Sequence, residues 1–309
     1  MKIFLIGASG SIGWPLFQFL KKKKKLIGTY HKNYKPGLIK FSLGSNKSEN
    51  NLINKISEKD LIIFMAAETN VSWVYENPKK SLNINYISTI KFIKRLIKCN
   101  VRIIYFSSAE VFNGKKGYYN ESSKPDPVNT YGKTKYKVEN FLKKTKYKNY
   151  QIIRTGKNVN MLDEYKCMIT DTYQKLLTDD AKMAEDNLFT ITHVNNFNTA
   201  MLKLINLKSN NKIFHLCSDD VLSRVKFANL IRKSSKYKNK MQYRIVKFKD
   251  IDYKEPRACK NNLTCNKTKK ILKVKFKKAI SFITNGFLCF RSLVLIKCFC
   301  DFGLVVRFG

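Results

Sequence analysis

The chain has 309 residues and a formal net charge of +38, with 60 Lys and Arg against 22 Asp and Glu. This length can bury a full hydrophobic core, and the lysines are spread along the whole chain instead of forming one stripe, so we expect no nucleic-acid partner. The eight cysteines form no Cys-x-x-Cys pair and the three histidines are scattered, so we expect no metal site and reduced thiols in the cytoplasm.

The N-terminal segment predicts a strand, a glycine turn and a helix. The apolar run 1–6 ends at Gly7-Ala-Ser-Gly-Ser-Ile-Gly13, and Ile12, Leu16 and Leu20 then recur at helical spacing. Glycine lets the backbone approach a phosphate closely, and the helix N-terminus offers unpaired N–H groups. We therefore expect a dinucleotide pyrophosphate at this turn, although its glycine spacing differs from that of ordinary dehydrogenases. The apolar run is too short for a signal peptide.

Residues 26–30 predict a second strand, which His31 and Lys32 follow directly, with Lys35 nearby. An acidic residue at this point would bind the ribose hydroxyls of NAD, whereas basic residues accommodate the additional phosphate of NADP. NADP(H) is therefore the expected cofactor, and NAD(H) is the alternative.

Further strands are predicted at 38–43, 61–67 and 101–106, and Pro78 opens a helix that reaches about Lys98. The strand at 101–106 ends at two hydroxyls, Ser107 and Ser108. In open α/β sheets the ligand lies beyond the carboxyl ends of the strands, so these hydroxyls are candidates for chemistry. In the alternative interpretation they only end the strand and bond the backbone.

Tyr131 and Lys135 lie one helical turn apart in a helix that is predicted to start at the N-cap Asn129 and to run to about 144. A nearby cation favours the charged form of an acid, so we expect Lys135 to lower the pKa of Tyr131 below its usual value of about 10. Tyr131 would then donate and accept a proton near neutral pH.

The remaining chain predicts a strand at 150–155, strands at 188–194 and 212–217, and helices at 197–207 and 223–234. His193 and His215 lie in apolar, strand-like runs and are expected to be structural.

We expect a nucleotide-binding domain over 1–155, a substrate-binding portion over 156–283 and an atypical hydrophobic tail over 284–309. Charges at Arg291, Lys297 and Asp301 interrupt that tail, so no transmembrane span is predicted. An interfacial helix, a dimer contact and an out-of-frame end are left as alternatives for it.

Three motifs together resemble the extended short-chain dehydrogenase/reductase family, which acts mainly on nucleotide sugars. They are the glycine turn, the segment Phe106-Ser-Ser-Ala-Glu-Val-Phe112 and Asn129-Thr-Tyr-Gly-Lys-Thr-Lys135. The combination looks most like the dTDP-4-dehydrorhamnose reductases. Further similar segments are Ala66-Ala-Glu-Thr69, Glu76-Asn-Pro78, Asn83-Ile-Asn85, Pro125-Asp-Pro127, Ile152-Ile-Arg-Thr155 and Glu255-Pro-Arg257.

This resemblance implies an α/β fold with a Rossmann-type, doubly wound parallel sheet and a smaller C-terminal substrate-binding portion. It implies a homodimer that reduces a 4-keto nucleotide sugar with NADPH, in the biosynthesis of deoxysugars and cell-surface polysaccharides. The implied catalytic residues are Ser108, Tyr131 and Lys135. The implied cofactor-binding residues are Gly7, Ser9, Gly10, Ser11, Ile12, Gly13, His31, Lys32, Ala66, Ala67, Thr69, Tyr131 and Lys135.

The sequence departs from the reductase pattern at two places. The pattern Ser-Thr-Asp-Tyr-Val-Phe is replaced by residues 107–112, in which Ser108 keeps a hydroxyl and Ala109 replaces the Asp. Related dehydratases need an Asp-Glu pair, so Glu110 alone argues against dehydration. The reductases usually have a small residue, Trp and an aromatic residue where this chain has 156–159, which predicts an altered sugar pocket. A nucleotide-sugar 4-epimerase with bound NAD and a non-catalytic, NADP-binding regulatory subunit are the alternative functions.

Overall fold

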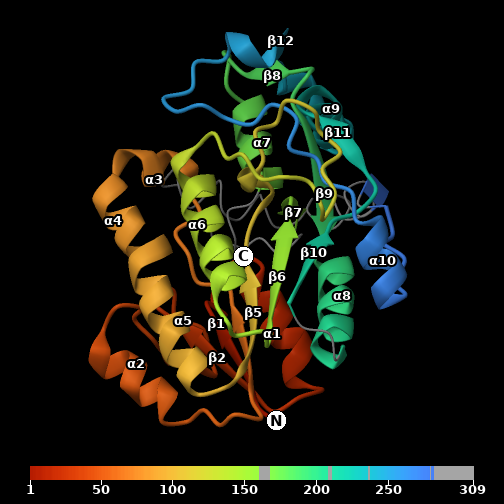
Figure 1. Ribbon diagram of the computed structural model, residues 1–309. Coiled ribbons are helices and arrows are strands. Elements are labelled where there is room, and N and C mark those ends of the chain that lie inside the picture. Colours follow the sequence, from red (N-terminus) through yellow and green to blue (C-terminus); the bar gives the residue numbers. More distant parts are fainter. Residues whose placement is uncertain (160–167, 208–210, 236, 279, 282–309) are drawn as a thin grey trace, which may run out of the picture.

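A computed structural model describes residues 1–159, 168–207, 211–235, 237–278 and 280–281, so the predicted tail 284–309 lies outside the described residues. In the part that the structure describes, the large sheet has seven parallel strands in the order β10-β6-β5-β4-β1-β2-β3 (Figure 1). These strands are β1 (Ile3–Ile6), β2 (Leu26–Tyr30), β3 (Leu38–Lys40), β4 (Leu61–Phe64), β5 (Arg102–Phe106), β6 (Tyr150–Thr155) and β10 (Lys212–Leu216).

The strand order reverses direction between β1 and β4, because β2 and β3 lie on one side of β1 and β4 to β6 on the other. This reversal creates the switch point at which open parallel sheets bind ligands. The predicted Rossmann-type, doubly wound fold is thereby confirmed.

Helices cover both faces of the large sheet, because its strands are apolar on both faces. Ile3 and Leu5 of β1 pack into a cluster with α1 (Gly13–Lys21) and α8 (Val194–Asn206). Phe4 and Ile6 face the other cluster, which includes side chains from α2 (Asn46–Ile53), α5 (Thr89–Lys98) and α6 (Thr130–Lys144). Successive side chains of a strand point to opposite faces, so this four-residue strand contributes to both layers.

The helix that was predicted from Pro78 to Lys98 contains a π-helical segment. It consists of α4 (Pro78–Leu82), the π-helix η1 (Asn83–Ser88) and α5. The buried Asn85 of η1 accepts a hydrogen bond from the backbone N–H of Glu68 at 2.8 Å and donates one to the carbonyl of Glu68 at 2.9 Å. These two bonds fix the chain that follows β4. Segments of this kind are often found at functional sites.

A smaller part lies beyond the carboxyl ends of the large sheet, at the top of Figure 1. It has one sheet in the order β11-β9-β7 and a second in which β12 pairs with β8. Its elements are β7 (Lys157–Val159), α7 (Met168–Leu176), β8 (Lys182–Ala184), β9 (Leu188–His193), β11 (Val221–Ser223), α9 (Arg224–Ser234) and β12 (Arg244–Val246). The chain returns to the large sheet through α8 and β10, and the proposed domain division at 155 stays a prediction.

Shorter elements complete the described chain: α3 (Val71–Glu76), η2 (Ala109–Val111), η3 (Lys238–Lys240), η4 (Phe248–Asp250) and α10 (Asn266–Leu272).

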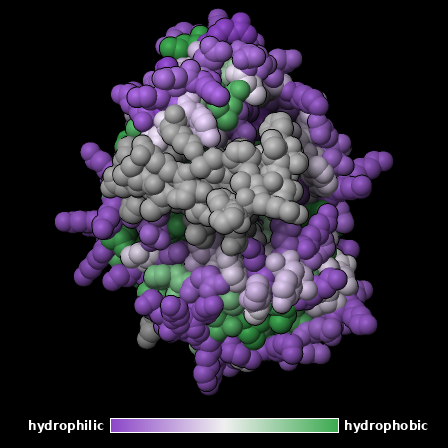
Figure 2. Space-filling model, turned by 180° about the vertical axis from the view of Figure 1, so that it is seen from behind, coloured by the Kyte–Doolittle hydropathy of each residue, from purple (hydrophilic) through white to green (hydrophobic). Residues whose placement is uncertain are grey.

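Hydrophilic residues cover most of the described surface on the face seen in Figure 2, as expected for a chain with lysines along its whole length. None of the helices that the structure describes is long and apolar enough to span a bilayer.

Both histidines that were predicted to be structural bond the backbone. Nδ1 of His193 accepts from the N–H of Asn195 at the start of α8, and Nδ1 of His215 lies 3.0 Å from the carbonyl oxygen of Thr264. Burial lowers the pKa of His193 to about 4 and that of His215 to about 3, so both rings are neutral at physiological pH.

Candidate active site

The glycine turn between β1 and α1 is shaped by close backbone contacts. Gly7 has φ of +88°, and a Cβ there would lie 2.8 Å from the nitrogen of Ala66. A Cβ on Gly13 would lie 2.4 Å from the carbonyl oxygen of Gly7. At Gly10 the nearest described atom would be 3.5 Å away, an ordinary contact, so this glycine leaves space on the outer side of the turn. The first turn of α1 carries no acidic side chain, which leaves its N-terminus suited to an anion.

The other predicted cofactor residues lie along the same edge of the sheet. The N–H of Gly7 donates to the hydroxyl of Thr29 at 3.0 Å, which ties the turn to the end of β2. His31 and Lys32 follow β2 and are exposed. The segment 66–69 follows β4, with half-buried alanines and an exposed Thr69. The turn, the basic pair and this segment therefore lie at the carboxyl ends of β1, β2 and β4.

The predicted catalytic residues converge beyond the carboxyl end of β5. Ser108 follows β5; its hydroxyl accepts from the N–H of Glu110 at 3.2 Å and acts on the phenol of Tyr131 on α6 by lowering its pKa. Lys135 lies one turn farther along α6, with Nζ 5.9 Å from the centroid of the Tyr131 ring. This ammonium donates to the carbonyl of Phe106 at 2.8 Å. Tyr131 and Lys135 are buried, with exposed fractions of 7% and 3%.

The start of α6 is held directly against the chain after β5. Asn129 is the N-cap, and its Oδ1 accepts from the N–H of Gly132 at 2.8 Å. A Cβ on Gly132 would lie 2.0 Å from the carbonyl oxygen of Glu110, so only glycine allows this approach. The N-cap and Gly132 thus place Tyr131 next to Ser108.

The expected direction of the Tyr131 pKa shift is wrong. Burial raises the pKa of Tyr131, the carboxylates of Glu110 and Glu68 raise it further, and the hydrogen bond with Ser108 partly opposes them. Burial also lowers the pKa of Lys135 to about 7, and Glu139 opposes this shift. Lys135 is therefore only partly charged at neutral pH, and it lowers the pKa of Tyr131 less than an exposed lysine would. Tyr131 therefore remains protonated at neutral pH, the state that a general acid requires.

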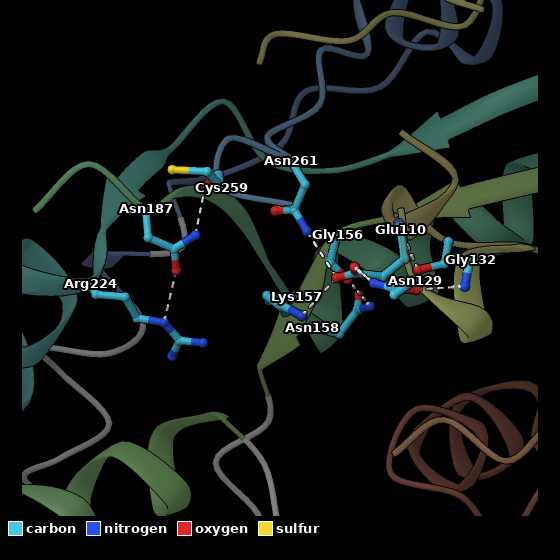
Figure 3. Close-up of polar contacts among 11 residues, drawn as sticks. Glu110, Asn129, Gly132, Gly156, Lys157, Asn158, Asn187, Arg224, Cys259 and Asn261 are labelled. Carbon is cyan, nitrogen blue, oxygen red and sulfur yellow. Dashed lines mark hydrogen bonds and ion pairs between the residues drawn. The ribbon is translucent and has the colours of Figure 1, made fainter. Parts of the chain in front are cut away.

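Glu110 joins four segments of the chain, a role that the sequence did not indicate. Its Oε2 accepts from Asn129 Nδ2 at 2.8 Å, and its Oε1 accepts from Asn261 Nδ2 at 2.9 Å (Figure 3). Lys157 Nζ lies 3.3 Å from the same Oε1. No local pattern could have revealed this cluster, because Asn261 is 151 residues away from Glu110 in the chain.

A buried ion pair lies one turn beyond Lys135. Arg154 on β6 donates from Nε to Glu139 Oε1 at 2.9 Å and from Nη2 to Glu139 Oε2 at 2.6 Å. Both side chains have no exposed surface. Glu139 could have been found in the sequence, because it continues the four-residue spacing of Tyr131 and Lys135.

The smaller part contributes a cation to the same region. Arg224 Nε donates to Asn187 Oδ1 at 3.2 Å, and Asn187 Nδ2 donates to the carbonyl of Cys259 at 2.6 Å (Figure 3). Burial lowers the pKa of Arg224, and the negative charge of Glu110 acts in the opposite direction. Asn187 therefore fixes the guanidinium of Arg224 against the segment at Cys259.

These features can be compared with known proteins. Residues 1–284 match the family model of the RmlD substrate binding domain. The chain belongs to this family. The match covers most of the sequence and agrees with the predicted place in the extended short-chain dehydrogenases/reductases.

Two kinds of relative accompany the family match. The chain is 26% identical over 135 residues to methionine adenosyltransferase 2 subunit beta of Rattus norvegicus, which is 43% of this chain and 40% of that protein. This match therefore spans less than half of the relative.

Among solved structures, a hypothetical dTDP-4-dehydrorhamnose reductase from Sulfolobus tokodaii is 23% identical, with a TM-score of 0.78 over 91% of this chain and 98% of that one. The enzyme of that name from Bacillus anthracis, in complex with NADP, is 20% identical, with a TM-score of 0.79 over 93% and 98%. These two structures share the fold of this chain.

Proposed function

We propose that the protein is an NAD(P)-dependent oxidoreductase that reduces a 4-keto nucleotide sugar, with NADPH preferred and NADH possible. The observation that carries this proposal is the convergence of Ser108, Tyr131 and Lys135 on the sheet edge that also holds the glycine turn. The turn fits a dinucleotide, because Gly10 leaves space beside the N-terminus of α1. NADP in the complex of the Bacillus anthracis reductase supports the choice of cofactor.

Each predicted cofactor residue has a role in this proposal. The turn from Gly7 to Gly13, with Ser9, Ser11 and Ile12, binds the pyrophosphate through backbone N–H groups and the dipole of α1. His31 and Lys32 hold the phosphate that distinguishes NADP from NAD. The segment 66–69 borders the cofactor, and Lys135 holds its nicotinamide ribose. Bound NADPH supplies the hydride.

The substrate ketone takes its proton from Tyr131. Because the pKa of this phenol is raised, it keeps the proton until negative charge develops on the carbonyl oxygen. Ser108 donates a hydrogen bond to the same oxygen and so stabilises the developing charge. General acid catalysis of this kind typically contributes a factor of about 10² to 10⁴.

The test supplies NADPH and a panel of nucleotide 4-keto sugars and follows the nicotinamide absorbance. Tyr131→Phe should lower turnover by at least about 100-fold and leave NADPH binding nearly intact. Tyr136→Phe, on the same helix, is the matched control and should retain activity. If no sugar of the panel oxidises NADPH, the proposal is wrong. Co-purified NAD with turnover in the absence of reductant would instead indicate a 4-epimerase.

We further propose that the protein acts as a homodimer in the cytoplasm, in the biosynthesis of deoxysugars for cell-surface polysaccharides. In this proposal residues 1–155 bind the cofactor and residues 156–283 supply most contacts with the substrate. Light scattering of the purified chain tests the dimer, and a monomeric mass would contradict it. The division is tested on the full chain, because α8 and β10 complete the large sheet from outside 1–155: Lys32→Met should weaken NADPH binding and leave substrate affinity unchanged.

A second candidate function is that of a non-catalytic, cofactor-binding subunit in a hetero-complex. The match to a protein named as a subunit of methionine adenosyltransferase favours it. In that case the purified chain binds NADPH without turning over any keto sugar of the panel, and it co-purifies from its source cells in a stable stoichiometric complex. Turnover of a keto sugar by the isolated chain would exclude this function.

A further inference from the structure

The two places at which the sequence departs from the reductase pattern contact each other in the structure. Glu110 belongs to the altered segment after β5, and Lys157 to the altered segment after β6. These strands are neighbours in the sheet, so both segments leave it at the same edge. Lys157 Nζ lies 3.3 Å from Glu110 Oε1, so an ion pair joins the two altered segments (Figure 3).

The lysine is the exchangeable member of this pair. Glu110 already accepts from Asn129 at 2.8 Å and from Asn261 at 2.9 Å, each through a different oxygen. If Lys157 turned away, each carboxylate oxygen would keep a hydrogen-bond donor, so no acceptor of Glu110 would be left unsatisfied.

The lysine is also the member that a ligand would meet. The side chain of Lys157 is 38% exposed, whereas that of Glu110 is 10% exposed. Glu110 pairs with Lys157 and also accepts from Asn129, the N-cap of the helix that carries Tyr131, so one carboxylate links the ammonium to the start of α6. A sugar whose keto carbon lies at Tyr131 would therefore extend its ring substituents toward a positive charge.

We propose that Lys157 is a specificity-determining residue whose ammonium leaves Glu110 to bind a carboxylate on the sugar ring of the substrate. The protein then prefers an acidic nucleotide sugar, such as a nucleotide-linked uronic acid, over a neutral hexose. This inference rests on the proposed function and narrows its substrate class. An ammonium–carboxylate contact in a partly buried site corresponds to about ten- to hundredfold in affinity.

The test compares two pairs of probes by calorimetry in the presence of NADP and 0.15 M salt. UDP-glucose is compared with UDP-glucuronate, and dTDP-glucose with dTDP-glucuronate, so that within each pair only a carboxylate replaces a hydroxymethyl group. The wild-type protein should bind the acidic member of at least one pair about ten- to hundredfold more tightly. Lys157→Met should abolish this preference while changing affinity for the neutral probe less than about twofold. Lys157→Arg, which keeps the charge, should retain the preference.

Lys91→Met is the matched control, because it removes the same charge from the exposed surface of α5. If this variant loses the preference as Lys157→Met does, the net charge of the protein and not Lys157 attracts the acidic probes. Equal affinity of the wild-type protein for both members of a pair, or a preference that survives Lys157→Met, also overturns the inference while the proposed function stands. Binding of none of the four probes overturns this inference, and if no keto sugar of the panel oxidises NADPH either, the proposed function is wrong with it.

Discussion

Glu139→Gln removes one charge from a fully buried ion pair and keeps the shape of the side chain. In the native protein both carboxylate oxygens accept from Arg154, at 2.9 and 2.6 Å, and neither side chain is exposed. Arg154 has little other polar support, because among the described residues its Nη1 has no hydrogen-bond partner, and its Cζ lies 5.0 Å from the centroid of the apolar Phe112 ring. The variant therefore leaves a buried guanidinium without its counter-charge.

Breaking a buried pair by removing one partner typically lowers the free energy of unfolding by about 3–5 kcal/mol. Native domains are stable by only about 5–15 kcal/mol, so the loss is a large share of the total. At roughly 2 °C per kcal/mol for a chain of this size, we expect Tm to fall by about 6–10 °C. Removal of Glu139 also withdraws the charge that raises the pKa of Lys135, so that pKa should fall below about 7.

Urea and thermal unfolding followed by circular dichroism measure the effect. Glu76→Gln is the matched control, since Glu76 pairs with Lys254 at the surface and is 46% exposed. Surface pairs contribute about 0–1 kcal/mol, so this control should change Tm little. A decrease for Glu139→Gln no larger than that of Glu76→Gln would refute the reasoning. The double variant Glu139→Leu/Arg154→Met should recover most of the loss, because it leaves no buried charge.

Other predictions follow from the same site. Because burial lowers the pKa of Lys135 to about 7, the unfolded chain binds more protons than the native one from about pH 7 to pH 10. Between pH 7 and 9 the unfolding free energy should therefore rise by about 2 kcal/mol more in the wild type than in Lys135→Met, and parallel urea midpoints for the two would contradict this. Gly13→Ala should lower Tm, because its Cβ would lie 2.4 Å from the carbonyl oxygen of Gly7, whereas Gly10→Ala should leave Tm unchanged and weaken NADPH binding measured by fluorescence quenching. Asn129→Ala should lower the urea-derived unfolding free energy by about 1–2 kcal/mol, and no change would mean that the cap of α6 is dispensable.

The local features of this protein follow from its sequence. The glycine turn, the strand that ends at Ser108 and the helix with Tyr131 and Lys135 were predicted from short patterns, and the structure has them at those positions. Such features depend on hydrophobic periodicity, on glycine and on caps, which act over a few residues. The doubly wound parallel sheet followed from the resemblance to a known family, whereas the order of its strands came from the structure. The π-helical segment at Asn83–Ser88 was missed, because it depends on the contact between Asn85 and Glu68.

Only the tertiary structure decided the charges around the proposed catalytic residues. From the sequence, Lys135 is the nearest charge to Tyr131, and a lowered phenol pKa follows. In the folded chain, burial raises that pKa, and Glu110 and Glu68 approach from other segments. Arg154 on β6 and Asn261 near the end of the described chain complete the two charge clusters. A pKa depends on desolvation and on distances between residues that are far apart in the chain, and a local sequence pattern predicts neither of them. The sequence by itself therefore indicated the residues that we propose as catalytic, and the tertiary structure decided their protonation and placed Lys157 against Glu110.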